Sequence, residues 1–242
     1  MSIFYSLFLI ITPAAASFIL FLRIKKNRIL VSKSFFWHYA FGFFIFTLVH
    51  IPIFFINLGV TISYRTLITL NFVSFLAMFF SYLLFYRGTL LLFTKERFLT
   101  TVFPLIVLPI IATLAVISLL VLKIESLIRY TAVVWGFLLP NNTYLGSIFL
   151  YFFVKGAPFD SAKRQSGILV LGLAWFLVLA TDIHLWIHAV TYDPQFWIIK
   201  IASLKGDLVF RSFAYLLILI GCLLYSRGLN KRLKDSKTEK KV

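Results

Sequence analysis

Two histidines in the sequence VLATDIHLWIHAV, His184 and His188, have a spacing that would let both bind the same ligand. Residues four apart lie on one face of an α-helix, about 6 Å apart along its axis, so two imidazoles can bind one metal ion. His50 lies at a similar depth in another apolar segment. If the segments are neighbours, the three imidazoles predict a zinc, copper or haem site near the outer leaflet. The alternative is that these imidazoles reach interfacial water or bond a neighbouring helix, and no resident cofactor is then expected.

Asp182 and Arg211 form a second candidate site because each is an ionisable group inside an apolar segment. Such residues within a membrane span are costly and are by default functional candidates with a partner. Arg211 lies about one turn into its segment, at nearly the depth of Asp182, so the sequence predicts a charge pair. Two alternatives stay open: Arg211 bonds Asp207 at the i,i+4 spacing, or the pair only holds two helices together.

Three amides are the remaining polar markers, Asn71 in one apolar segment and Asn141 with Asn142 in another. Pro140 precedes the last two, and a proline inside a helix removes one backbone hydrogen bond. This break predicts either a cavity for a small polar ligand or ion, or a kink whose freed groups are met by the Asn and Thr143 side chains.

The composition places all of these residues in a membrane. Of the 242 residues, 61% are hydrophobic and 13% are charged, against averages of about half and about a quarter. So few polar groups cannot cover a water-soluble fold of this size. A single cysteine, Cys222, excludes an internal disulfide. The sequence therefore predicts an all-α integral membrane protein.

Apolar runs of about 20 residues predict a bundle of seven spanning helices in one domain, residues 1–228, followed by a basic cytoplasmic tail, 229–242. The approximate spans are 2–22, 35–57, 66–86, 100–122, 130–154, 167–189 and 208–226. Eighteen of the 24 Lys and Arg residues fall on one side of this bundle, which predicts an outside N-terminus and a cytoplasmic C-terminus. The net charge of +16 then reflects topology and attraction to anionic lipids, and no nucleic-acid partner is expected. We expect the plasma (inner) membrane.

Two predicted spans end alike, with SYLLFYRG at 81–88 and GCLLYSRG at 221–228. This likeness predicts two parallel three-helix halves joined by the fourth helix, a repeat pattern that small transporters use. The alternative is that Leu-Leu-aromatic followed by Arg-Gly is common where helices meet the cytoplasm. The numerous Phe and Tyr side chains are expected mostly to face lipid or to form the interface belt.

Three functions fit these residues. A sensing or receptor-like bundle would bind a ligand or proton at an outer polar site, because histidine titrates near neutral pH. In outline the chain resembles the seven-span input regions of bacterial sensor proteins, and it would signal through a separate partner or the subunits of a complex. A small-solute transporter would use the amides, and a metal or haem protein would use the three histidines. No catalytic residues are expected, since no Gly-Xaa-Ser-Xaa-Gly turn is present, and the last span has no lysine for retinal.

Overall fold

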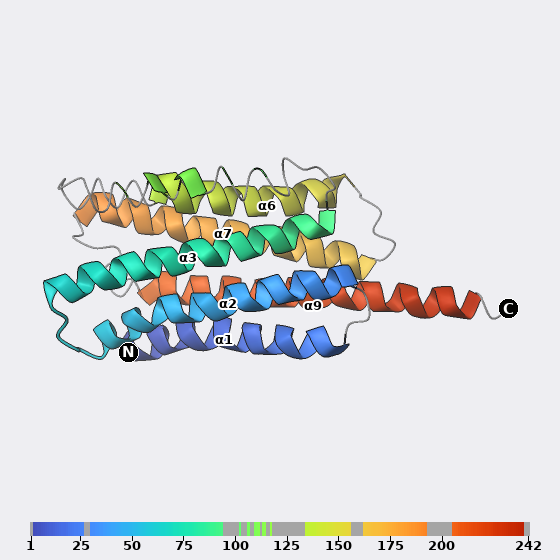
Figure 1. Ribbon diagram of the computed structural model, residues 1–242, viewed down its shortest axis with the longest axis horizontal. Coiled ribbons are helices and arrows are strands. Elements are labelled where there is room, and N and C mark those ends of the chain that lie inside the picture. The colour runs from blue at the N-terminus through green and yellow to red at the C-terminus, as the bar shows by residue number, and fades with distance from the viewer. Residues whose placement is uncertain are drawn as a thin grey trace.

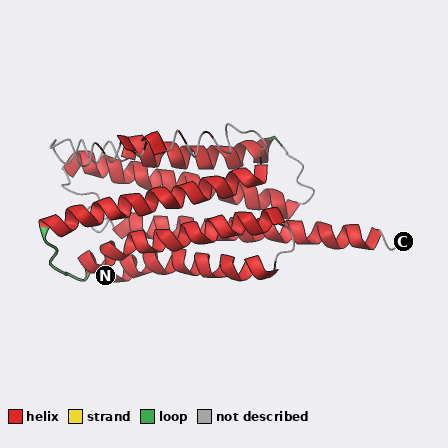
Figure 2. Cartoon of the chain, viewed as in Figure 1, coloured by secondary structure: helices red, strands yellow, loops and turns green. Residues whose placement is uncertain are grey.

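The apolar runs of the sequence form long helices in the computed structural model (Figures 1 and 2). The structure describes residues 2–26, 30–93, 134–155, 162–192 and 205–239, with isolated positions at 102, 106, 109–111, 113–114 and 117. Within this part of the chain, six helices are long and apolar enough to cross a membrane. The protein is therefore a multi-pass membrane protein, and its described part is all-helical. The helices are α1 (Ser2–Lys26), α2 (Leu30–Asn57), α3 (Tyr64–Phe93), α6 (Leu139–Val154), α7 (Ala162–Tyr192) and α9 (Lys205–Glu239).

Six of the seven predicted spans coincide with these helices, while the expected span at 100–122 lies largely outside the described residues. The expected span at 130–154 appears from residue 134 onward, as a π-helical turn η2 (Val134–Leu138) followed by α6. The last helix is longer than its predicted span, because α9 continues through Glu239 and projects beyond the bundle towards the C-terminus (Figure 1). The segment predicted as a separate tail is thus mostly a continuation of the helix.

The helices pack in the order α1, α2, α3, α6, α7, α9, and α9 returns to α1 (Figure 1). Consecutive neighbours run antiparallel, with two exceptions. α3 and α6 run in the same direction, because Phe75 contacts Phe137 and, further along both helices, Tyr86 contacts Tyr144. α1 and α9 also run in the same direction, from the end that holds the N-terminus to the opposite end (Figure 1). The packing therefore contains two parallel contacts, and they lie on different sides of the ring.

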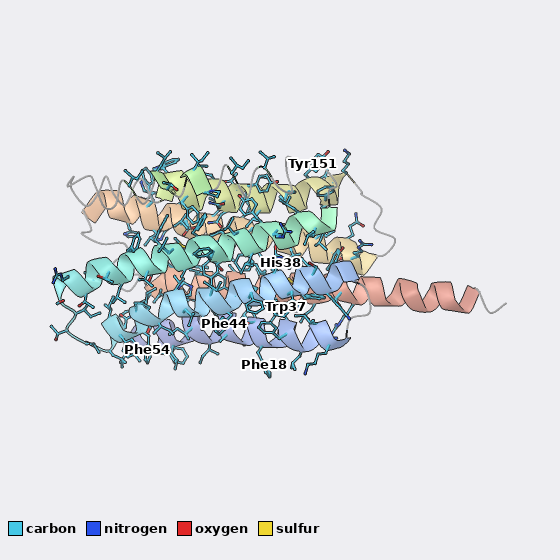
Figure 3. The ribbon with its side chains drawn as sticks, viewed as in Figure 1. Phe18, Trp37, His38, Phe44, Phe54 and Tyr151 are labelled. Atoms are coloured by element: carbon cyan, nitrogen blue, oxygen red, sulfur yellow. The ribbon has the colours of Figure 1, made fainter. Side chains whose placement is uncertain are left out.

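Large aromatic side chains fill the centre of the bundle. Six of them are almost fully buried and contact one another: Phe43, Phe46, Tyr82, Phe85, Trp175 and Tyr215. The expectation that Phe and Tyr mostly face lipid is wrong for this set, because helix association in a membrane relies on close packing and large rings supply many contacts. Other rings do point outwards, as Phe18 and Phe44 do in Figure 3.

The α7 and α9 backbones approach each other closely at two glycines, Gly167 and Gly221. A Cβ atom placed on Gly167 would lie 2.6 Å from the backbone nitrogen of Tyr225 and 2.8 Å from the backbone oxygen of Gly221. Small residues permit such close contact between membrane helices. This contact fixes the relative position of the two helices that carry the candidate charge pair.

Candidate functional site

An ion pair between Asp182 on α7 and Arg211 on α9 lies inside the bundle. The guanidinium of Arg211 donates directly to the Asp182 carboxylate. Asp182 is 0% exposed and Arg211 is 4% exposed, so both charges are withdrawn from solvent and lipid. Taking ions out of water costs several kcal/mol each in effective terms, and a direct partner with further hydrogen bonds is needed to offset this cost. The pair therefore ties α7 to α9 strongly.

The Asp182 carboxylate has a second donor on a third helix. The amide nitrogen of Asn142 on α6 donates to its other oxygen at 2.5 Å. The amide oxygen of Asn142 in turn accepts a hydrogen bond from the hydroxyl of Tyr82 on α3, also at 2.5 Å. We call these four residues, Tyr82, Asn142, Asp182 and Arg211, the buried polar network. Its hydrogen bonds run without a gap across α3, α6, α7 and α9.

A second polar contact lies close to Arg211. His50 on α2 and the hydroxyl of Tyr215 on α9 are 3.1 Å apart, and both side chains are buried. Tyr215 follows Arg211 by one helical turn, and Arg211 is near enough to interact electrostatically with both His50 and Tyr215. The other ring nitrogen of His50, Nδ1, is buried without a hydrogen-bond partner. The polar interior therefore extends to α2, where Nδ1 of His50 is unsatisfied.

A hydrogen-bonded His–Asp pair joins α7 to α9 nearer the end that holds the N-terminus. The ring nitrogen Nδ1 of His184 lies 2.7 Å from a carboxylate oxygen of Asp207. The His184 side chain is 55% exposed and that of Asp207 is 7% exposed. The ring centroids of His184 and His188 are 4.5 Å apart, with an angle of 75° between the ring planes. Arg211 follows Asp207 by one turn, so α7 and α9 carry an accessible pair and, one turn deeper, a buried one.

The three histidines that the sequence grouped as metal ligands have different neighbours. His184 contacts His188 on one side and Asp207 on another, whereas His50 contacts Tyr215 and Phe46. The described residues contain no group of three or more His, Cys, Asp or Glu side chains suited to a metal ion. Asp207 pairs with His184, and Arg211 pairs with Asp182.

The amides differ in their roles. Asn142 belongs to the buried polar network, while Asn141 donates to the backbone oxygen of Phe137, one turn earlier in the chain. The side chain of Asn71, on α3, lies outside the described residues. This bond satisfies the carbonyl of Phe137, three residues before Pro140, while the amide oxygen of Asn141 is buried without a partner.

Sequence reasoning missed two members of the polar interior, Tyr82 and Tyr215. Both were grouped with the general aromatic content of the chain. Their position offers a signal in retrospect, because a tyrosine hydroxyl in the middle of a span must find a hydrogen-bond partner. Tyr215 is also spaced four residues after Arg211, on the same face of its helix.

No protein-family model, curated protein or solved structure matches the chain.

Proposed function

We propose that the protein is a membrane-embedded sensor in which a proton or a small polar ligand acts at the His184–Asp207 pair and α9 carries the change to the opposite end. One observation carries this proposal: the accessible His184–Asp207 pair and the buried Asp182–Arg211 pair join the same two helices, one turn apart. A change at the accessible pair therefore acts on helices whose packing depends on a buried ion pair. The half-exposed imidazole of His184 contacts both the Asp207 carboxylate and the His188 ring, so a ligand from solvent can reach this pair.

The shape of α9 supports the same function. The helix has 35 residues, about 52 Å at 1.5 Å per residue, whereas the hydrocarbon core is about 30 Å thick. It begins beside Asp207 and continues past Arg227, where its candidate span ends. A continuous helix transmits a shift or rotation from one end to the other, so the projecting segment is suited to contact a separate signalling partner.

We further propose seven spans, with the N-terminus outside and the C-terminus in the cytoplasm. The parallel direction of α3 and α6 supports a further crossing at 100–122, between them in the sequence. The basic residues support the orientation, because Lys25, Lys33 and Arg87 lie at the end where α9 projects. Residues 1–228 then form one domain.

The test measures whether the outer pair controls the position of α9. Spin labels are placed at Leu91 on α3 and Arg227 on α9, both exposed, in a Cys222→Ser background. We expect the distance distribution in lipid nanodiscs to differ between pH 5 and pH 8, and Asp207→Asn to remove the difference. Arg65→Gln, a loss of an exposed charge on α3, is the matched control and should keep it. The proposal would be overturned if the parent protein gave the same distribution at both pH values, or if Asp207→Asn kept the full difference.

A small-solute transporter is the second candidate, because the helix packing has an internal correspondence. In each half, α1–α2–α3 and α6–α7–α9, the middle helix packs against the other two. The two parallel contacts, α1 with α9 and α3 with α6, correspond to each other if the halves are exchanged. Parallel repeats of this kind occur in small transporters, with the substrate site between the halves.

Thiol accessibility separates the two candidates. Thr181 is 4% exposed, neighbours Asp182 and bonds only its own helix, at the backbone oxygen of Val178. Thr181→Cys in the Cys222→Ser background therefore reports on the buried polar network with little disturbance. Labelling by a membrane-impermeant maleimide from both sides of sealed vesicles favours the transporter, since its site must open alternately to each side. Protection from both sides favours the sensor.

A further inference from the structure

A groove with a volume of about 380 Å³ lies on the surface between α2 and α3, away from the buried polar network. Its lining consists of Ser34, Trp37, His38, Phe41 and Leu84. Figure 3 shows Trp37 and His38 on α2 beside α3, near the end of the bundle where α9 projects. The groove therefore lies near one membrane interface.

The lining of the groove is mostly apolar, and two cationic side chains lie about one helical turn beyond lining residues on α2 and α3. Lys33, Trp37 and Phe41 are spaced four residues apart and share one face of α2, with Lys33 nearest the helix start. On α3, the exposed Arg87 follows Leu84 by about one turn, and it is close enough to interact electrostatically with His38. Positive charge therefore lies at the interface end, and aromatic and aliphatic surface lies towards the membrane centre.

The walls of the groove are held in place by contacts outside it. The rings of Trp37 and Phe41 stack with centroids 4.2 Å apart, and Phe21 of α1 packs edge-on against both. His38 donates from Nδ1 to the backbone oxygen of Ser34 at 2.6 Å, which fixes the orientation of its ring. A preformed site loses little conformational entropy when a ligand binds.

We propose that this groove binds an anionic phospholipid, with one acyl chain along Trp37, Phe41 and Leu84 and its phosphate between Lys33 and Arg87. Basic pockets between membrane helices hold anionic lipid headgroups, and each Lys or Arg near the surface adds to this attraction. A neutral lipid fits the apolar part equally well but gains little from the two cations. The occupant is therefore selected by charge, and this inference does not depend on the proposed sensing function.

Native mass spectrometry of the detergent-purified chain tests the proposal with phosphatidylglycerol and phosphatidylcholine of identical acyl chains. We expect phosphatidylglycerol to bind at least tenfold more tightly. Lys33→Gln and Arg87→Gln should each weaken its binding about fivefold and leave phosphatidylcholine unchanged. Arg65→Gln, an exposed arginine at the opposite end of α3, is the matched control and should have no effect. Equal binding of the two lipids, or an equal loss in Arg65→Gln, would overturn the proposal.

A second measurement needs no charge variant. Brominated acyl chains quench a nearby indole, so brominated phosphatidylglycerol should quench the parent protein more than brominated phosphatidylcholine does. The difference should disappear in Trp37→Phe and persist in Phe44→Leu, whose ring is 50% exposed on the same helix. Equal quenching by both lipids overturns the assignment. If the protein forms a dimer only when phosphatidylglycerol is absent, the groove binds a second copy of the chain. That result would also overturn the proposal of a lipid site.

Discussion

Breaking the buried ion pair from one side should cost far more than removing it altogether. Asp182→Asn leaves the Arg211 cation inside the bundle without a carboxylate, and Arg211→Met leaves the carboxylate with only the Asn142 amide as a donor among the described residues. Each single change should lower the free energy of unfolding by about 3–5 kcal/mol, the range for one partner lost from a buried pair. Both residues are almost fully buried, so solvent cannot replace the missing partner.

The double variant Asp182→Asn/Arg211→Met should recover most of this loss. It removes both charges, and an asparagine at position 182 still offers an oxygen to Asn142, so we expect a net loss of about 1–2 kcal/mol. The coupling energy in the double-mutant cycle is then at least about 4 kcal/mol. Ordinary polar contacts between membrane helices average about 0.6 kcal/mol and reach about 1.7 kcal/mol. The expected value lies clearly outside that range.

Reversible unfolding by SDS in mixed micelles, followed by tryptophan fluorescence and by helicity, gives the four free energies of this cycle. Arg65→Met is the control for loss of a cation, because Arg65 is exposed on α3, and its effect should stay within about 0.5 kcal/mol. If the effects of the two single changes add in the double variant, the pair is not energetically coupled and the reasoning from its burial is refuted.

Two further predictions use the same unfolding assay. Tyr82→Phe should cost about 1–3 kcal/mol, because it leaves the buried amide oxygen of Asn142 without its donor; no loss would show that this bond is absent in the membrane. Gly167→Ala should cost about 1–3 kcal/mol by forcing α7 away from Tyr225 of α9, while Gly136→Ala, whose added Cβ meets nothing within 4 Å, should be close to neutral. Equal effects of the two glycine substitutions would contradict the close approach of these backbones.

The sequence alone determined that this is a helical membrane protein. It also predicted the six spans that coincide with the described helices. Long apolar runs in lipid must satisfy their backbone hydrogen bonds within each segment, so length and hydrophobicity are enough to predict helices. The same argument singled out Asp182, Arg211 and Asn142, since polar groups within such runs are rare. The argument did not predict the last part of α9, because the polar segment after Arg227 carries no apolar pattern. The structure continues the helix through Glu239.

Only the tertiary structure decided which polar groups meet. The sequence allowed Arg211 to bond either Asp182 or Asp207, and the helix packing gives it Asp182 while Asp207 pairs with His184. Periodicity along one helix says which residues share a face, but not which neighbouring helix that face contacts. The partners of His50 and Asn142, two tyrosines on other helices, depend on that choice of neighbours. The chemistry of the interior is therefore a property of helix packing, which no single segment encodes.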